Sequence, residues 1–482
     1  MKKLLFVTIL LLLSKITFTQ NNAFELKNFH PDSTQQELRD LFQEFRLKHP
    51  GFYRYNNAIT FDQKIDSIIT SIKKPVNELE IYRLIKPIFA EIGCLHTGIS
   101  LSEKTETLLD VQPNCLPFLL LHKQGKAYIW KNYSKHQEIK IGSEITKING
   151  QSIESIYQKL LQNIPMDGFN KTGKFKLLEY SFPTWYRNII EITTDFSIEL
   201  KSNNSSEETF TFSTKGIKAN QLPSYQDMIS KKLNLKIEGD IAILTIPSFS
   251  NSYHKANSQK FKKEIKQYFK KIKKEKIKNL IVDFRGNTGG SDSNAALFVS
   301  HFFEKPFRYW DRIEVSEPIA KDIKGFNRLF YAKPEKQDSI WLWKKSPLFT
   351  SEFDFYKKQK PAKNIFQGDT FFLIDGLCMS SCADAAAILS FNKKATFIGQ
   401  ETGGGFQGNT SGLIPESQLS SGLIFSIPLL KYINAVDPTI NFGRGTIPDI
   451  EVESSPLYNL NGKDATLEMA FDIIKNIPIP SH

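Results

Sequence analysis

Long apolar runs are nearly absent from this sequence. The run in MKKLLFVTILLLLSKITFTQ is about ten residues long and breaks at Ser14 and Lys15, well short of the roughly 20 residues that a membrane span needs. Two lysines precede it and the small-residue pattern Thr17-Phe18-Thr19 follows, which is typical of a secretory signal cleaved before Gln20. We therefore expect residues 1–19 to be a signal peptide and the mature protein to be exported, periplasmic or secreted, without stable membrane insertion.

Cysteine is also scarce, with only four residues in 482. No CxxC pair or neighbouring histidine spacing suggests a zinc site, so we expect no metal and no cofactor. Export permits disulfides, and four cysteines allow three complete pairings, which leaves the pairing open. The four are Cys94, Cys115, Cys378 and Cys382.

Acidic residues are in the minority, and the net charge is +12. Much of the basic excess lies in KFKKEIKQYFKKIKKEKIKN, residues 260–279, where apolar residues recur at helical spacing. No recognition motif or interleaved aromatic pattern accompanies the lysines, so we expect an amphipathic helix with a solvated lysine face and no nucleic-acid partner. Its apolar positions are Phe261, Ile265, Phe269 and Ile272.

The length predicts two or three domains, and the chain contains no internal repeat. Residues 20–105 are dominated by helical periodicity, with an Asp/Ser start signal in DSTQQELRDLFQEFRLKHPGFYRY and a second helix ending at Gly93. Residues 106–215 are rich in strand patterns. Residues 216–482 alternate strand and helix, which predicts an α/β core with crossover connections. The expected fold class is therefore α/β, within an α+β multidomain chain.

The strand-rich region contains IKIGSEITKINGQSIESIYQKLL. A strand ends at Asn149-Gly150, and a helix is predicted to begin after Ser152. The stretch resembles a PDZ domain in Gly142, Ile145, Ile148, Asn149 and Gly150, although an Asn-Gly hairpin is also a generic turn. A PDZ-like domain would capture an extended peptide by adding it to a sheet edge.

Two stretches of the α/β region follow buried strands and lack familiar motifs. DFRGNTGGSDSN has neither the lysine nor the spacing of a phosphate-binding loop, but its glycines can aim backbone N–H groups at one point, as an oxyanion hole requires. DGLCMSSCADAAAIL places four potential nucleophiles where a strand runs into a helix, and it lacks the GxSxG of an α/β-hydrolase. Ser381 with Asp384 also fits a capping box.

These stretches, together with HPGFYRY, EIGCLHTGIS and GRGTIPDIEV, resemble the C-terminal-processing (tail-specific) proteases, serine peptidases of family S41. The resemblance is to the branch that includes the tricorn core protease and the interphotoreceptor retinoid-binding repeats. It implies a crotonase-like or ClpP-like peptidase core with Ser380 as nucleophile and the Ser381 N–H as oxyanion donor. Gly289, or alternatively Gly290, would supply the second donor, and Asp283 and Arg285 would hold that turn.

The base differs between branches of this family. One branch uses a lysine in a loop that here reads GQETGGGFQGN, with glycine in its place; Lys393, Lys394 and Lys431 lie outside the matching position. The other uses a histidine in an H-T motif, which falls on His96 in CLHTGIS, and an acidic residue nearly sixty positions after the serine. Asp437 lies 57 positions after Ser380 and fits approximately, with Asn441 nearby and equally polar.

The resemblance therefore implies an exported serine endopeptidase that acts on extended or C-terminal polypeptide segments through an acyl-enzyme. A catalytically inactive peptide- or ligand-binding protein on the same fold is the alternative. A cysteine peptidase using Cys378 or Cys382 is disfavoured by an oxidising compartment. If His96 reaches Ser380, a disulfide from Cys94 to either of these cysteines would pin the helical region to the core, whereas a Cys378–Cys382 bridge would constrain one turn. The oligomeric state is left open.

Overall fold

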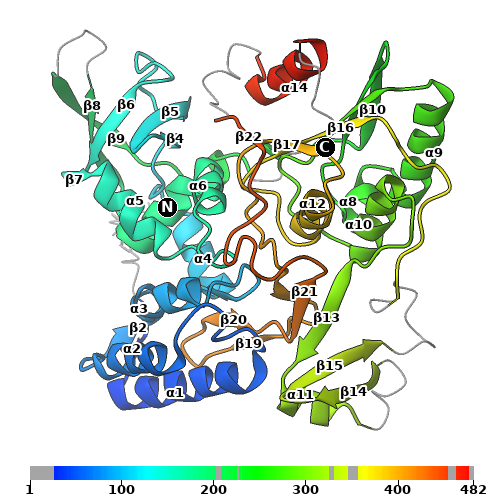
Figure 1. The fold of residues 1–482 in the computed structure, drawn as a ribbon. Helices are drawn as coiled ribbons and strands as arrows, with labels where there is room; N and C mark the ends of the chain where they lie inside the picture. The colour runs from blue at the N-terminus through cyan, green and yellow to red at the C-terminus, as the bar shows by residue number, and fades with distance from the viewer. Residues whose placement is uncertain are drawn as a thin grey trace, which may run out of the picture.

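The fold is that of a computed structural model, which describes residues 26–201, 208–224, 227–228, 231–324, 331–345, 357–453 and 463–476 (Figure 1). The expected signal peptide, residues 1–19, lies outside this part of the chain. None of the described helices is long and apolar enough to cross a membrane. Helices combine with several separate sheets, which confirms the predicted α/β multidomain class.

A six-stranded sheet forms the centre of the C-terminal half, in the order β10-β11-β12-β16-β17-β22. β10 and β11 form an antiparallel hairpin, and the other neighbours run parallel, which requires the crossover connections that the strand–helix alternation predicted. The strands are β10 (Asn234–Glu238), β11 (Ile241–Thr245), β12 (Asn279–Asp283), β16 (Asp369–Ile374), β17 (Thr396–Gly399) and β22 (Ile450–Glu451).

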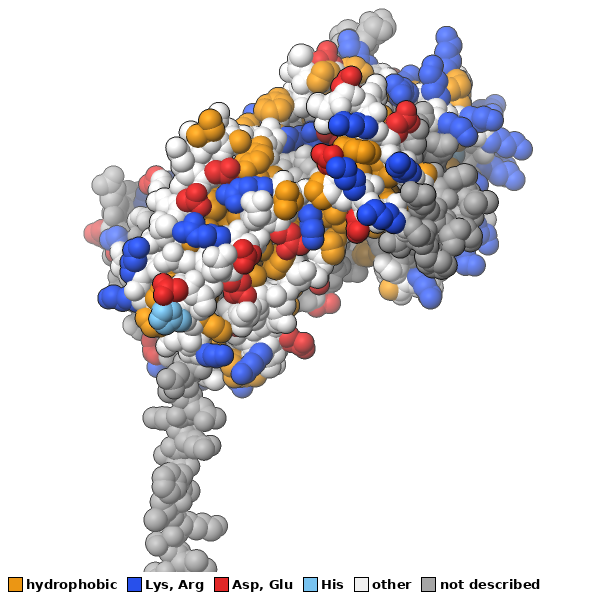
Figure 2. Space-filling view, turned by 90° about the horizontal axis from the view of Figure 1, so that it is seen from below, with side chains coloured by type: hydrophobic (Ala, Val, Ile, Leu, Met, Phe, Trp, Pro, Cys, Tyr) orange, Lys and Arg blue, Asp and Glu red, His pale blue; other side chains and the backbone are white. Residues whose placement is uncertain are grey.

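Helices cover both faces of this sheet. Apolar side chains of one face, such as Val282 and Phe372, join a core with α9, α10 and α12, and those of the other face pack on α14. The His254 ring of α8 (Asn251–Ala256) packs on Phe261 at the start of α9. The predicted lysine-rich helix is confirmed as α9, because its four apolar residues are buried and its lysines are exposed. Figure 2 shows basic side chains crowded at one end of the face seen from below. The helices are α9 (Phe261–Lys274), α10 (Asp292–Val299), α12 (Ser381–Phe391) and α14 (Ala465–Asn476).

Two smaller sheets connect this core to the rest of the molecule. A five-stranded antiparallel sheet has the order β14-β15-β13-β21-β18, beside α11 (Glu317–Asp322). A three-stranded sheet, β19-β20-β3, joins the N-terminal region to the C-terminal half, because β3 pairs with β20. The strands are β3 (Gly98–Ser100), β13 (Trp310–Val315), β14 (Tyr331–Gln337), β15 (Ile340–Lys345), β18 (Thr410–Ser411), β19 (Glu416–Gln418), β20 (Ile424–Ser426) and β21 (Leu430–Asn434).

The N-terminal half contains a helical cluster and a sheet that share one core. The sheet has the order β4-β5-β6-β8-β9, and β7 pairs with β6 through the predicted Asn149-Gly150 turn, in which both residues have positive φ. Ser152 caps α5 as predicted. The resemblance to a PDZ domain and the domain boundaries stay predictions. The elements are β1 (Asn28–Phe29), α1 (Pro31–Lys48), α2 (Ala58–Thr70), β2 (Val76–Asn77), α3 (Glu78–Glu91), α4 (Glu103–Asp110), β4 (Phe118–Lys123), β5 (Lys126–Asn132), β6 (Glu144–Ile148), β7 (Gln151–Ser152), α5 (Ile153–Leu161), α6 (Thr172–Trp185), β8 (Asp195–Lys201) and β9 (Thr209–Lys215).

Candidate active site

Ser380 lies at the junction between the loop that follows β16 and the first turn of α12. Its backbone has φ 50° and ψ −131°, a region that residues with a Cβ rarely occupy and that costs on the order of 1–3 kcal/mol. The carboxylate of Asp375 stabilises the turn by accepting hydrogen bonds from the backbone N–H groups of Gly286 at 3.1 Å and Leu377 at 3.0 Å. Such strain persists only where the surroundings enforce it. The Ser380 side chain is half-buried.

The imidazole of His96 meets this hydroxyl. The distance from His96 Nε2 to Ser380 Oγ is 3.3 Å, across a sequence separation of 284 residues. α3 ends just before Gly93, whose φ of 69° turns the chain, and β3 begins two residues after His96 and pairs with β20 of the C-terminal half. The N-terminal helical region therefore places His96, a potential base, next to Ser380, a potential nucleophile.

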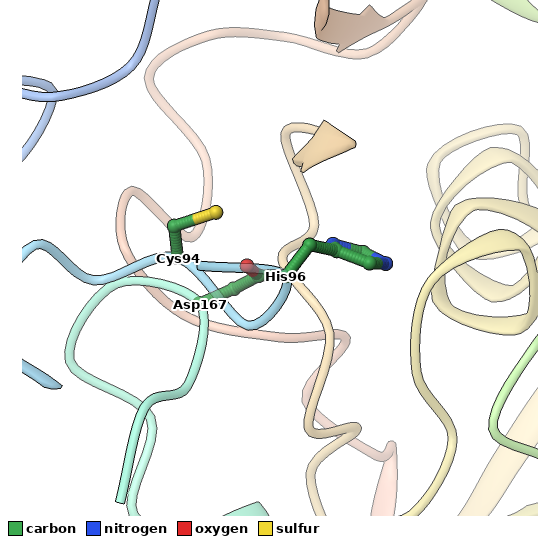
Figure 3. Close-up of side chains that lie close together, drawn as sticks. All are labelled: Cys94, His96 and Asp167. Carbon is green, nitrogen blue, oxygen red and sulfur yellow. The ribbon is translucent and has the colours of Figure 1, made fainter. Parts of the chain in front are cut away.

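The other ring nitrogen of His96, Nδ1, is buried and has no hydrogen-bond partner in the described part of the chain. Burial lowers the pKa of His96 from its ordinary value, and the nearby carboxylate of Asp167 and the backbone of Thr410 partly oppose this shift. Asp167 is buried, and its two oxygens accept hydrogen bonds from the backbone N–H groups of Leu95 at 2.9 Å and Gly405 at 3.1 Å. Figure 3 shows the side chains of Cys94, His96 and Asp167 lying close together. Asp167 thus sits behind the imidazole and joins the two segments that surround it.

Asp437 is placed differently from what the family spacing implied. Its Oδ1 accepts hydrogen bonds from the backbone N–H of Thr439 at 2.8 Å and from Thr439 Oγ1 at 2.7 Å, within its own turn. These bonds lower the pKa of its carboxyl. The side chain therefore stabilises the turn before β22, and no hydrogen bond joins it to His96 among the described residues.

Sequence reasoning missed Asp167. It occurs in IPMDGFN, where the Asp-Gly pair is an ordinary turn signal, and Gly168 has φ 60° as such a turn requires. The turn is fixed by long-range backbone contacts: the Gly168 N–H donates to the Gly93 carbonyl at 2.9 Å, and the Phe169 N–H donates to the Gly443 carbonyl at 2.8 Å. No local sequence pattern predicts contacts between segments that are so far apart in the sequence.

The glycine-rich turn after β12 packs directly against the serine. A Cβ on Gly289 would lie 2.7 Å from Ser380 Cβ, so only glycine allows this approach. The Gly289 N–H already donates to Asn287 Oδ1 at 2.9 Å. Within the described residues no hydrogen bond uses the N–H of Gly290 or that of Ser381, which leaves these two as the available donors beside Ser380.

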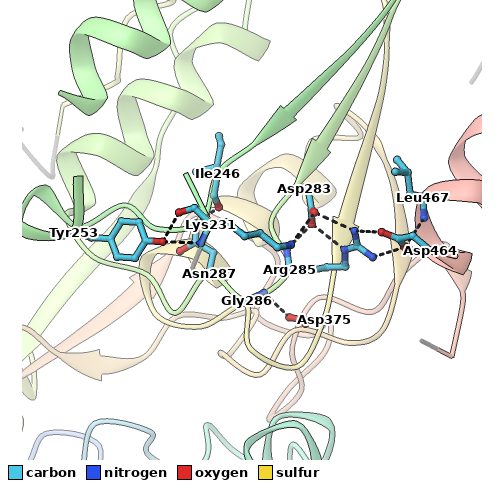
Figure 4. A network of polar contacts seen from close by, with 10 residues as sticks. All are labelled: Lys231, Ile246, Tyr253, Asp283, Arg285, Gly286, Asn287, Asp375, Asp464 and Leu467. Atoms are coloured by element: carbon cyan, nitrogen blue, oxygen red, sulfur yellow. Dashed lines mark hydrogen bonds and ion pairs between the residues drawn. The ribbon is translucent and has the colours of Figure 1, made fainter. Parts of the chain in front are cut away.

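Asp283 and Arg285 form an ion-pair network at the base of this turn (Figure 4). Arg285 binds Asp283 through Nε at 2.9 Å and Asp464 through two contacts of 2.7 Å, and Lys231 reaches Asp283 at 3.2 Å. Burial alone would raise the pKa of Asp283, but Arg285 and Lys231 hold it well below its usual range. The network ties the turn to the start of α14 and touches neither Ser380 nor His96.

The predicted capping box is wrong. Ser380, not Ser381, precedes the helix, and the buried Ser381 Oγ has no hydrogen-bond partner among the described residues. Asp384 instead accepts hydrogen bonds from Asn434 Nδ2 at 3.0 Å and from Asn409 Nδ2 at 3.3 Å, and burial raises its pKa to about 7. Ser380 occupies the N-cap position instead, and its positive φ prevents the extended backbone conformation that a capping serine adopts.

All four cysteines are free and buried. The Cys94 thiol donates to the Thr410 carbonyl at 3.3 Å, so the proposed bridge from Cys94 to Cys378 or Cys382 is not formed. Cys378 and Cys382 are adjacent to each other, with their Sγ atoms 2.6 Å apart. Burial raises the pKa of both thiols, which keeps them protonated and disfavours either one as a nucleophile.

The lysines considered as alternative bases point elsewhere. Lys431 Nζ pairs with Glu314 at 2.8 Å, and Lys394 Nζ lies over the ring of Phe303 at 5.2 Å. Lys393 has φ 50° in the turn that ends α12. No hydrogen bond joins any of the three to Ser380 within the described residues.

Comparisons with known proteins give one matching family and several similar folds. Residues 240–452 match the model of peptidase family S41. The fold is similar to that of mature CPAF in complex with lactacystin (TM-score 0.65, 12% identity, 92% of this chain and 98% of that chain covered) and to mature CPAF alone (TM-score 0.63, 12%, 92% and 97%). The photosystem II D1 C-terminal processing protease is also similar (TM-score 0.41, 11%, 87% and 93%). No curated protein sequence matches the chain.

Proposed function

We propose that this chain, whose residues 240–452 match the model of peptidase family S41, hydrolyses polypeptides with Ser380 as nucleophile and His96 as general base. The observation that carries the proposal is the 3.3 Å contact between His96 Nε2 and Ser380 Oγ at a strained strand-to-helix turn. A serine hydroxyl is a weak nucleophile until a base within hydrogen-bond reach removes its proton. The contact is slightly long, as such contacts often are before substrate binds.

In this mechanism, neutral His96 accepts the Ser380 proton at Nε2 while Oγ attacks the peptide carbonyl. The Ser381 N–H at the start of α12 and the Gly290 N–H stabilise the oxyanion, since the Gly289 N–H is engaged by Asn287. The imidazolium then donates its proton to the leaving amine. Water, activated by the same histidine, hydrolyses the acyl-enzyme and frees the serine.

We propose Asp167, in place of Asp437, as the residue that orients His96 and stabilises the imidazolium. Asp167→Asn removes the charge and keeps the volume, and we expect kcat to fall by about 10²- to 10⁴-fold. Because the Asp167 charge raises the pKa of His96, the acidic limb of the pH profile of kcat/KM should also move to lower pH in the variant. Steady-state kinetics on a peptide substrate from pH 4 to 9 measure both effects.

Asp437→Asn is the matched control, with the same chemical change at the residue that the family spacing favoured. We expect less than about a threefold change in kcat and an unshifted pH profile, because within the described ranges the Asp437 carboxylate accepts hydrogen bonds from Thr439 alone. Since Asp167 also holds two backbone N–H groups, the variants are compared where thermal melts show both to be folded. A large loss in Asp437→Asn with a normal Asp167→Asn would reverse the assignment.

We also propose that the protein is exported and acts on extended or C-terminal segments of other polypeptides. The support for export is the N-terminal pattern of two lysines, an apolar run and small residues before Gln20. The mature protein is expected to begin at Gln20 and to lack residues 1–19. N-terminal sequencing and intact mass of the protein from the exported fraction test this; retention of Met1 there would contradict cleavage.

A further inference from the structure

Cys94, His96 and Asp167 form the one group of metal-ligating side chains found in the described ranges of the chain. One donor atom from each lies within 4.8 Å of the other two. The three come from two separate segments, the 93–97 turn and the loop after α5 (Figure 3). The hydrogen bond from the Leu95 N–H to Asp167 holds these segments together. The thiol of Cys94 and the carboxyl of Asp167 thus lie near His96, away from the Nε2 atom that meets Ser380.

We propose that these three side chains bind a divalent transition-metal ion, zinc in particular, and that binding switches off His96 as a base. Three atoms with mutual distances of no more than 4.8 Å can lie within about 2.8 Å of one point. Zinc binds such donors at about 2.0–2.3 Å, so side-chain shifts of about half an ångström or slightly more would complete the site.

A second observation points to a ligand independently of this spacing. No hydrogen bond of good geometry reaches the buried His96 Nδ1 from the described residues, although the Thr410 backbone lies near the ring. A buried nitrogen of this kind carries a desolvation cost that a bound cation would remove. The Thr410 carbonyl, 3.3 Å from Cys94 Sγ, offers a further oxygen nearby. The mixed sulfur, nitrogen and oxygen donors favour zinc over magnesium or calcium, which prefer oxygen alone.

Metal binding has a defined chemical consequence for the base. The thiol of Cys94 loses its proton to solvent and binds as thiolate, and His96 donates the Nδ1 lone pair to the metal. The one proton of the neutral imidazole must then sit on Nε2, the nitrogen that meets Ser380 Oγ. Nε2 becomes a donor and cannot accept the serine proton, and Asp167 is diverted from His96 to the ion.

The inhibitory part of this inference rests on the proposed role of His96, whereas the binding part does not. Binding is therefore measured first, by titrating Co²⁺ into the full chain made without a polyhistidine tag. We expect one ion per chain and a thiolate-to-cobalt charge-transfer band. Cys94→Ala should lose the band, and Cys115→Ala, which removes another buried thiol, should keep it. Absence of the band, or its persistence in Cys94→Ala, would overturn the site.

Inhibition is measured next, with Zn²⁺ against peptide cleavage. Wild type and Cys115→Ala should be inhibited and recover with a chelator, whereas Cys94→Ala should need at least about tenfold more Zn²⁺. Equal sensitivity of wild type and Cys94→Ala to Zn²⁺, or full activity of zinc-loaded wild type, would overturn the switch.

Should Cys94→Ala unfold, as thermal melts will show, Cys94→Ser replaces it because a serine hydroxyl is a poor zinc ligand. If wild type has no peptidase activity, the proposed function fails and the cobalt spectrum still decides the site.

Discussion

Ser380→Ala is expected to lower the kcat for peptide hydrolysis by at least about 10⁴-fold, which is the scale of loss when a serine peptidase loses its nucleophile. The variant removes one oxygen that, among the described residues, hydrogen-bonds only to His96 Nε2, at 3.3 Å, so the fold should survive. The backbone strain at φ 50° is the same for alanine as for serine, and we expect the free energy of unfolding to change by less than about 1 kcal/mol. Digestion of a panel of denatured proteins, with cut sites read by mass spectrometry, measures the loss.

Ser381→Ala is the neighbouring comparison. It keeps the backbone N–H that we place in the oxyanion hole and removes a buried hydroxyl without a hydrogen-bond partner in the part of the chain that the structure describes, so activity should stay within a few-fold of wild type. Loss of activity in Ser381→Ala but not in Ser380→Ala would exchange the two roles. A wild-type protein that cuts nothing while Ser380→Ala still binds denatured chains equally well would favour the peptide-binding alternative.

The two principal candidate residues could be singled out in the sequence because each carries a local signal. Ser380 occupies a strand-to-helix junction that the apolar pattern around it defines, and His96 follows a helix that ends at a glycine. The family motifs added the pairing of the two residues, which no periodicity could supply. Their contact depends on β3 pairing with β20, a strand only three residues long whose register the sequence pattern does not specify.

Other features depended on details of backbone conformation that patterns do not specify. The capping box was predicted from residue types, yet the positive φ of Ser380 moves the helix start by one residue and leaves Ser381 Oγ without a partner. Gly289 was the preferred oxyanion donor, but Asn287 Oδ1 engages its N–H. Asp167 was missed because its position is fixed by backbone contacts with Gly93 and Gly443, both far away in the sequence.

His96→Ala should reduce kcat by about as much as Ser380→Ala, because the hydroxyl then has no base to take its proton. The two residues act as a unit, so the double variant should be no slower than either single variant, whereas independent roles would multiply the losses. Kinetics of the three variants, with the same peptide and at enzyme concentrations high enough to detect slow turnover, measure this non-additivity.

The pH profile of the wild type provides a second test of the same residue. His96 must be neutral to accept a proton, and burial lowers its pKa from the ordinary value of about 6.5. Activity should therefore persist from neutral pH to below about 6.5 and fall only when more acidic solution protonates the imidazole, with kcat/KM losing tenfold per pH unit beyond that point. A lysine base with an ordinary or moderately lowered pKa would lose activity at much higher pH. A wild-type profile that falls between pH 8 and 7, together with an active His96→Ala variant, would assign the base to a lysine instead.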